Sequence, residues 1–210
     1  MIQAKAVPQP IVSIVDDDDA VRSSLKLLLK SVGHRIADYA TAKDFLAAYR
    51  FEQSGCLVLD IRMPGMSGLE LQDHLNADGA IVPVIFISGH ADVPMAVEAV
   101  QQGAFDFLQK PFRDQALIDC VQAALERDAD NRRQLRERDN LRARLDSLTP
   151  REREVLALVT QGLANKVMAG DLGVSQRTVE IHRARVMEKM QAHSLAQLVR
   201  MMIVLEEEVS

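Results

Sequence analysis

The chain has little of what marks secreted, metal-rich or membrane-embedded proteins. It has no tryptophan, 4% aromatic residues and two cysteines, Cys56 and Cys120. The cysteines show no metal-ligand spacing, which favours small core residues in a reducing compartment over a disulfide. No apolar run approaches the roughly 20 residues of a membrane helix, and Met1 to Pro10 lacks the apolar core of a signal peptide. We therefore expect a cytoplasmic protein with no membrane partner.

The composition is otherwise ordinary, but charge is unevenly placed. Hydrophobic residues make up 48% and charged residues 26% of 210 residues, enough for one large or two small domains with cores. Residues 1–120 hold 10 Lys and Arg against 16 Asp and Glu, whereas residues 149–205 hold 8 against 5. This asymmetry indicates an acidic regulatory part followed by a weakly basic binding part.

One apolar run, Cys-Leu-Val-Leu at residues 56–59, stops abruptly at Asp60. Such a run predicts a strand buried on both faces, with the carboxylate at its carboxyl end. Three other apolar runs end at comparable polar positions, namely Asp16 with Asp17, Ser88, and Lys110. If the strands are parallel, three carboxylates, a hydroxyl and an ammonium converge on the edge where open α/β sheets bind ligands.

Three carboxylates within a few ångströms repel one another, and a hard divalent cation removes the conflict. Mg²⁺ suits such a site, because it takes few oxygen ligands and keeps positions for water and phosphate oxygens. Asp60 would then be an ionised nucleophile that forms an aspartyl phosphate. Ser88 and Lys110 would meet the phosphoryl oxygens, where charge gathers in the transition state.

Helical patterns alternate with the strands over the first 124 residues. An apolar spacing of four, three and four residues begins at Val21 and ends before Gly33, and Ser67 with Glu70 has capping-box spacing. This alternation predicts an α/β flavodoxin-like fold with a five-stranded parallel sheet in the order 2-1-3-4-5. That order places the acidic residues at 16, 17 and 60 on neighbouring central strands.

Residues 125–147 have a different composition, in which Arg alternates with Asp and Glu and neither Pro nor Gly occurs. We expect a long charged helical linker stabilised by short-range ion pairs. A disordered tether is the alternative, because between Glu126 and Asp146 only Leu135, Leu141 and Leu145 recur as large apolar residues.

Residues 148–210 begin with a strong helix start, in which Thr149 is a cap, Pro150 lies in the first turn and Glu152 completes a capping box. Two later helical segments are joined by a tight turn at Gly173, which indicates a helix-turn-helix. We predict a small all-α four-helix domain, so that the α/β part spans 1–124, the linker 125–147 and this domain 148–210.

Both parts resemble known families. The resemblance to the receiver domain of two-component response regulators, in their FixJ-like branch, rests on Asp16-Asp17, Asp60, Ser88, Lys110-Pro111 and the segment 60–68, Asp-Ile-Arg-Met-Pro-Gly-Met-Ser-Gly. The resemblance to the LuxR-type DNA-binding domain rests on segments 148–156, 162–166 and 177–183. Their pairing is similar to a FixJ/NarL-type transcriptional response regulator, not an enzyme acting on an external substrate.

The receiver resemblance implies that Asp60 accepts phosphate from the phosphohistidine of a sensor histidine kinase. It also implies that Asp17, Asp60 and the backbone carbonyl of Arg62 touch Mg²⁺, with Asp16 acting mostly through water.

The family's switch implies that Ser88 moves toward the phosphoryl group, the loop at 89–92 follows, and Phe107 rotates into the vacated space. The chain would then form a homodimer, through the fourth helix and fifth strand or through the first helix. The dimer would bind double-stranded promoter DNA, as an activator in contact with RNA polymerase.

In the helix at 175–191, the spacing turns Val179, Val186 and Met190 inward. The resemblance makes Glu180, Ile181 and Ala184 base-facing, so that Glu180 could accept from cytosine and Ile181 could contact a thymine methyl. The remaining candidate DNA contacts, mostly to phosphate, are Arg177, Thr178, Arg183, Arg185 and Lys189. A solvated surface helix is the alternative.

Two other functions are open at this point. Haloacid-dehalogenase phosphatases also phosphorylate an aspartate at a strand end, but they require a second acid where this chain has Arg62. An RNA-binding or protein-interaction output is a second alternative, disfavoured by the turn at Gly173 and the segment 178–182.

Overall fold

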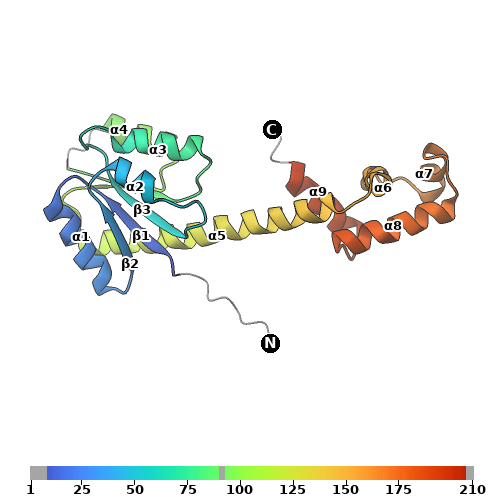
Figure 1. Ribbon diagram of the computed structural model, residues 1–210, viewed down its shortest axis with the longest axis horizontal. Helices are drawn as coiled ribbons and strands as arrows, with labels where there is room; N and C mark the ends of the chain where they lie inside the picture. The colour runs from blue at the N-terminus through green and yellow to red at the C-terminus, as the bar shows by residue number, and fades with distance from the viewer. Residues whose placement is uncertain (1–8, 90–92, 207–210) are drawn as a thin grey trace. The chain divides into compact units, whose positions relative to one another are not determined.

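The computed structural model describes residues 9–89 and 93–206. Its first part is built on one parallel five-stranded sheet with strand order β2-β1-β3-β4-β5 (Figure 1). The strands are β1 (Ile11–Val15), β2 (Arg35–Tyr39), β3 (Gly55–Asp60), β4 (Val84–Ser88) and β5 (Asp106–Gln109). The predicted fold class and strand order are confirmed.

Helices cover both faces of the sheet, because the central strands are buried on both sides. Helices α1 and α5 pack on one face against residues such as Ile14 and Val58. Helices α2, α3 and α4 lie together on the other face (Figure 1). Their bounds are α1 (Asp19–Ser31), α2 (Ala42–Ala48), α3 (Gly68–Ala77), α4 (Val93–Gln101) and α5 (Asp114–Asp146).

Local sequence signals fix where these helices begin. Ser67 accepts a hydrogen bond from the backbone N–H of Glu70, and the Glu70 side chain accepts one from the Ser67 backbone, which completes the predicted capping box. Both cysteines are buried free thiols of the core, as predicted.

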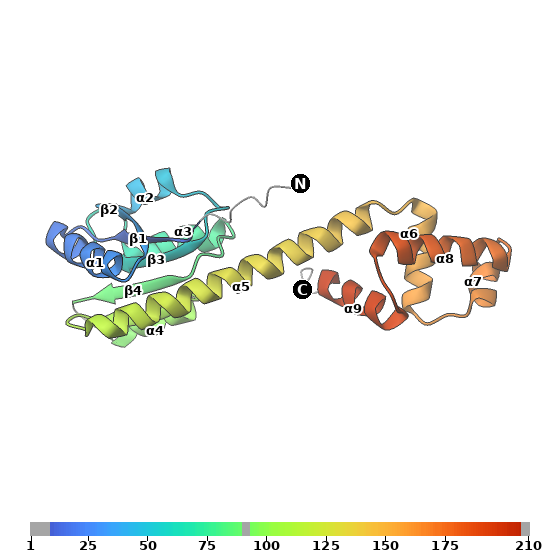
Figure 2. The ribbon, with the colours of Figure 1, turned by 90° about the horizontal axis from the view of Figure 1, so that it is seen from below.

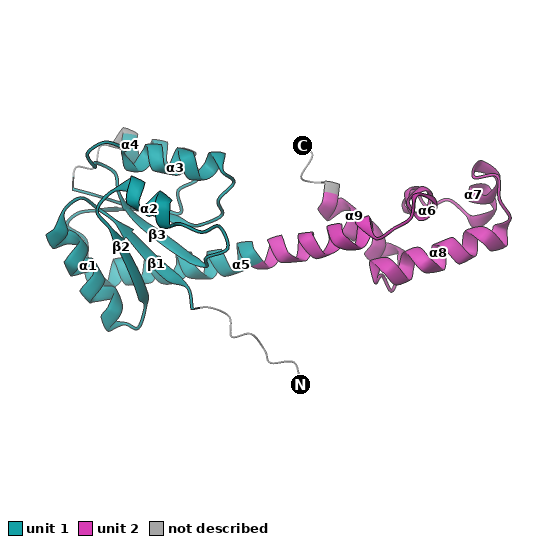
Figure 3. Ribbon diagram, viewed as in Figure 1, with its two compact units in different colours: residues 1–132 teal, residues 133–210 magenta. Residues whose placement is uncertain are grey.

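Helix α5 is continuous over 33 residues, so the predicted helical linker is confirmed over the disordered tether (Figure 2). The chain divides into two compact units, residues 1–132 and 133–210, and the boundary falls within this helix (Figure 3). Asp128 and Arg132 of this helix lie in the first unit and are 0% and 9% exposed.

Asp128 and Arg132 are buried by contacts with the segment that leads into β3. Asp128 accepts hydrogen bonds from the Ser54 hydroxyl at 2.6 Å and from the Gly55 backbone N–H at 2.9 Å. Arg132 donates to Asp128 and to the carbonyl of Phe51.

Gly55, the first residue of β3, lies too close to β1 for a side chain. A Cβ at this position would lie 1.8 Å from the Ile11 carbonyl oxygen.

The second unit contains the four predicted helices, α6 (Pro150–Thr160), α7 (Asn165–Asp171), α8 (Gln176–Met190) and α9 (Leu195–Glu206). They pack around a core that includes Val155, Met168, Val186 and Leu198. The turn between α7 and α8 passes through Gly173 with φ of +64°, a left-handed conformation that favours glycine. Among the described residues, no helix is both long and apolar enough to cross a bilayer.

Candidate functional site

Lys110 joins two of the predicted acidic residues at the carboxyl edge of the sheet. Its Nζ lies 2.8 Å from Asp16 Oδ2 and 2.9 Å from Asp60 Oδ1. Asp16 directly follows β1 and Asp60 ends the adjacent β3, so the parallel pairing of these strands brings the two carboxylates together. The backbone N–H of Arg62 donates to the other Asp60 oxygen at 2.8 Å, which fixes the orientation of that carboxylate.

The charges of this cluster perturb one another. Burial raises the pKa of Asp60, and the hydrogen bond from Lys110 opposes that effect. Burial alone would lower the pKa of Lys110, but its hydrogen bonds to Asp16 and Asp60 raise it above the ordinary value. The ammonium therefore stays protonated beside the two carboxyl groups.

The third predicted carboxylate is placed differently. Asp17 is exposed, and within the described residues no three acidic, His or Cys side chains form a group that could hold a metal ion. The oxygen-only donors and the excess negative charge fit a hard divalent cation such as Mg²⁺.

Ser88 and Phe107 occupy the positions expected from the sequence. Ser88 is 3% exposed at the end of β4, and its carbonyl accepts from the Lys110 N–H at 2.7 Å. Phe107 is half-buried on β5 and packs against the core beneath α4. In the loop after Ser88, residues 90–92 lie outside the described part of the chain.

Arg22 belongs to this site and was not predicted. Its Nη1 donates to the Asp16 carbonyl oxygen at 2.7 Å, and its Nη2 pairs with Asp19 at 2.7 Å. The side chain braces the β1–α1 turn that carries the acidic pair. The available signal was its spacing of three residues from Asp19, because side chains at i and i+3 of a helix lie on the same face.

In the second unit, α8 has the two faces that the spacing predicted. Val179, Val186 and Met190 are buried, as expected. The opposite, exposed face carries Arg177, Glu180, Ile181, Ala184, Arg185 and Glu188. Ile181 is 47% exposed, so this face presents an apolar side chain flanked by charges.

Three of the candidate DNA contacts are engaged within their own unit. Arg183 donates to Asn165 Oδ1 at 2.9 Å, which ties α8 to the first residue of α7. The Thr178 hydroxyl lies 2.8 Å from the Ser175 hydroxyl at the start of α8. Lys189 donates to Glu152 Oε2 at 2.6 Å and to the Ser147 carbonyl at 3.0 Å, so its ammonium anchors the end of α8.

Comparison with known families gives a match for each unit. Residues 12–122 match the family described as "Response regulator receiver domain". Residues 146–202 match the family described as "Bacterial regulatory proteins, luxR family".

Individual relatives resemble the chain over most of its length. It is 53% identical over 190 residues to "Transcriptional regulatory protein FixJ" of Azorhizobium caulinodans, covering 90% of each chain. It is 46% identical over 197 residues to "Nodulation protein W" of Bradyrhizobium diazoefficiens, covering 94% of this chain and 87% of that protein. The structure of "Response Regulator StyR" matches with a TM-score of 0.83 and 46% identity, covering 93% of this chain and 98% of that one.

Proposed function

The chain belongs to the FixJ-like response regulators, which join a receiver domain to a LuxR-type DNA-binding domain, and on this premise we propose how its two units act. It is a transcriptional regulator of a two-component system, and neither a phosphatase nor another catalytic enzyme. The proposal is that a sensor histidine kinase phosphorylates Asp60 and that this controls binding of promoter DNA.

The observation that carries the proposal is the ammonium of Lys110 shared by Asp16 and Asp60. An Asp60 oxygen attacks phosphorus, the bond to the histidine nitrogen of the kinase breaks, and an aspartyl phosphate forms. Lys110 and the Ser88 hydroxyl then bind phosphoryl oxygens in place of the lost carboxylate contact. When bound, Mg²⁺ would neutralise the transferring group, held by Asp17, Asp60 and the Arg62 carbonyl, with Asp16 acting mostly through water.

The phosphoryl group makes new contacts only in one arrangement of the receiver, so it shifts an existing equilibrium. Ser88 moves toward the group, the loop at 89–92 follows, and Phe107 rotates inward. The altered surface dimerises, which places two α8 helices on successive DNA half-sites. We place the protein in the cytoplasm. We propose that it activates transcription and contacts RNA polymerase.

Phosphodonor labelling of the full chain tests the receiver chemistry. Acetyl phosphate with MgCl₂ should give one stoichiometric phosphorylated species, resolved on a phosphate-affinity gel, and D60N should give none. D73N is the matched control, because Asp73 is an exposed acid on α3, away from the site. Labelling of D60N at the wild-type rate would refute the assignment of the phosphoacceptor.

Selection of bound genomic fragments with and without the phosphodonor tests the output. We expect enrichment of a few duplex sites that depends on the donor and on Asp60. The same fragments recovered equally from D60N would show that DNA binding does not depend on this residue.

A further inference from the structure

The receiver unit contains a second pocket on the sheet edge opposite the phosphoacceptor. It has a volume of about 450 Å³, within the usual range for small-molecule sites. Val84, the first residue of β4, and Phe105, just before β5, line one side of it. Asp60 and Ser88 end their strands at the other edge, so the pocket is separate from the site described above.

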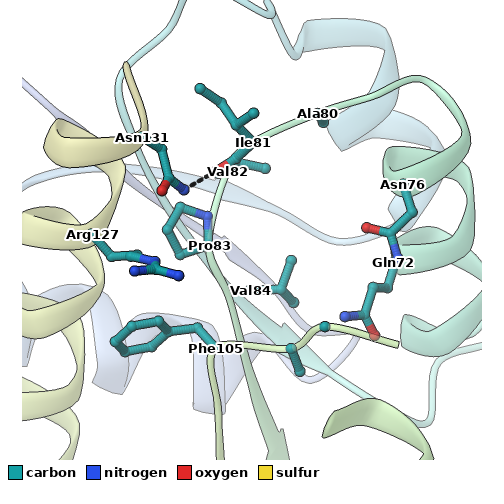
Figure 4. Close-up of a pocket in the computed structure, with 12 residues that line it drawn as sticks. Gln72, Asn76, Ala80, Ile81, Val82, Pro83, Val84, Phe105, Arg127 and Asn131 are labelled. Carbon is teal, nitrogen blue, oxygen red and sulfur yellow. Dashed lines mark hydrogen bonds between the residues drawn. The ribbon is translucent and has the colours of Figure 1, made fainter. Parts of the chain in front are cut away.

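Two helices supply polar side chains that face each other across this pocket. Figure 4 shows Arg127 and Asn131 entering from α5, with Gln72 and Asn76 of α3 opposite. Between the two helices, the segment around Pro83 and the ring of Phe105 give the pocket an apolar wall. The lining thus combines an apolar surface with a few convergent polar groups, which is typical of a ligand site.

Each amide side chain around the pocket donates one hydrogen bond to a backbone carbonyl. Asn76 Nδ2 and Gln72 Nε2 both donate to the Gln102 carbonyl, at 2.9 Å and 3.3 Å. Asn131 Nδ2 donates to the Ile81 carbonyl at 3.3 Å. Gln72 is 1% exposed and its Oε1 is shielded from solvent, whereas the Asn76 side chain is exposed and Figure 4 shows its amide oxygen on the pocket side. The Asn76 oxygen is therefore an acceptor for a ligand that brings an N–H group.

Arg127 provides the complementary charge. It is exposed at the pocket mouth, and across residues 9–89 and 93–206 its guanidinium has neither a hydrogen-bond partner nor an ion-pair partner. By contrast, Arg132, five residues further along α5, donates hydrogen bonds from all three guanidinium nitrogens, to Asp128 and to two backbone carbonyls. A free guanidinium offers a planar fork of donors that matches a carboxylate in two-point contact.

We propose that this pocket binds a small carboxylic acid with a flat apolar body and a hydrogen-bond donor at its far end. The carboxylate pairs with Arg127, the body lies against Pro83 and Phe105, and the donor reaches the amide oxygen of Asn76 on α3. The ligand bridges α5, α3 and the loop that leads from α4 into β5. Binding there is independent of phosphorylation at Asp60.

Titration of the isotope-labelled full chain with 4-aminobenzoate tests the site, because this probe has the carboxylate, the flat ring and the donor. We expect saturable shifts of the Gly103 and Ala104 amide signals, which lie in the pocket wall. R127Q should weaken binding roughly tenfold, the loss of one charge-assisted two-point contact. D60N should bind like wild type.

Control variants and control ligands distinguish specific binding in the pocket from non-specific binding. R136Q removes an exposed arginine from the same helix outside the pocket and should leave the affinity unchanged. Neutral 4-aminobenzamide should bind at least tenfold more weakly than 4-aminobenzoate, and benzoate, which lacks the donor, should also bind more weakly. Absence of saturable shifts at these amides, or equal affinity of R127Q and wild type, would overturn the proposal.

Discussion

The single positive charge of Lys110 lies beside two carboxyl groups at the proposed phosphoacceptor, so it neutralises them only in part. One ammonium serves the carboxylates of Asp16 and Asp60, both of which are buried, while Asp17 faces solvent. Each buried carboxylate has lost hydration, which is why burial raises the pKa of Asp60. The site therefore gains free energy when a further cation reaches it.

The first prediction is that MgCl₂ stabilises the receiver through Asp60. At one hundred times its dissociation constant, a ligand of the native state adds about 2.7 kcal/mol to the free energy of unfolding. We expect a gain of this order for wild type and D73N and little for D60N. The measurement is thermal unfolding followed by the fluorescence of Tyr39 and Tyr49, the two tyrosines of the chain, both in this unit. An equal rise in D60N would place the cation elsewhere.

Glu152 is a buried acid of the second unit that forms an ion pair with Lys189. It is 2% exposed, and the hydrogen bond from Lys189, aided by the backbone N–H of Thr149, lowers its pKa to about 2. In the unfolded chain a glutamate has a pKa of roughly 4.3. Its stabilising effect is therefore complete above that value and is lost as pH falls toward about 2.

We predict that E152Q removes this pH dependence from the DNA-binding unit. Urea unfolding of the full chain, followed through the methyl signals of Val179 and Val186, should give similar stability for wild type and E152Q near pH 2. The free energy of unfolding of wild type should exceed that of E152Q at neutral pH. E154Q is the control, since Glu154 is an exposed acid on the same helix. Equal stability of E152Q and wild type at every pH would contradict the prediction.

At the scale of elements, α5 carries buried charges that its sequence does not reveal. The dense charge of residues 125–147 predicts surface ion pairs, and the helix itself is confirmed. Asp128 and Arg132 are nevertheless buried, because their partners lie more than 70 residues away, at Phe51, Ser54 and Gly55. Periodicity within one helix cannot report a partner so distant in sequence, so the extent of the receiver had to come from the structure.

Replacing Arg132 with Met should destabilise the receiver by about 3–5 kcal/mol, because it leaves Asp128 charged and buried without its partner. R136Q, an exposed arginine on the same helix, should change stability by less than about 0.5 kcal/mol. Urea unfolding followed by tyrosine fluorescence measures both. A small effect of R132M would mean that Asp128 is satisfied by Ser54 and Gly55 alone.

Helix α8 shows what a sequence can and cannot predict about the side chains available to contact DNA. The 3.6-residue period gives its exposed face correctly, including Ile181 and Arg185. It cannot show that Lys189, half-buried on the same helix, is held by Glu152 and the Ser147 carbonyl. These partners favour a supporting role for Lys189, which was expected to contact phosphate.

We therefore predict different effects for two cations of α8. R185Q should weaken duplex binding similarly for all sequences and reduce the slope of log affinity against log salt by about 1, the loss of one phosphate contact. K189M should lower the thermal stability of the unit, with the salt slope of the folded protein unchanged. Fluorescence anisotropy with labelled duplex over a salt series gives both slopes. A reduced slope for K189M would restore it as a phosphate contact.

At the scale of the whole molecule, the two units were recognisable from sequence because each repeats a local pattern many times. Alternating buried strands and helices predicted the sheet order, and the capping box at Thr149 with the turn at Gly173 predicted the four-helix domain. The pocket lined by Asn76 and Arg127 was not predictable, because it forms only where α3 and α5 face each other.

If phosphorylation of the receiver is to control DNA binding, it must change a surface of the receiver through which two subunits then pair. Two candidate faces carry exposed apolar side chains, Val97 and Val100 on α4, at 48% and 58% exposure, and Leu27 on α1, at 74%. Helix α4 is the better candidate, because it begins five residues after Ser88 and packs on β5, which carries Phe107. A shift of Ser88 and Phe107 therefore reaches α4 directly.

The last prediction is that V100E abolishes phosphodonor-dependent dimerisation while L27E preserves it. A buried, unpaired carboxylate at the subunit interface opposes pairing, whereas the same change on α1 leaves the α4 face intact. Light scattering coupled to size exclusion, with acetyl phosphate and MgCl₂, measures the mass of each variant. Phosphate-affinity gels on the same samples must show Asp60 labelled in both, so that lost dimerisation is not lost phosphorylation. A labelled V100E dimer together with a labelled L27E monomer would move the interface to α1 and leave the phosphoacceptor assignment intact.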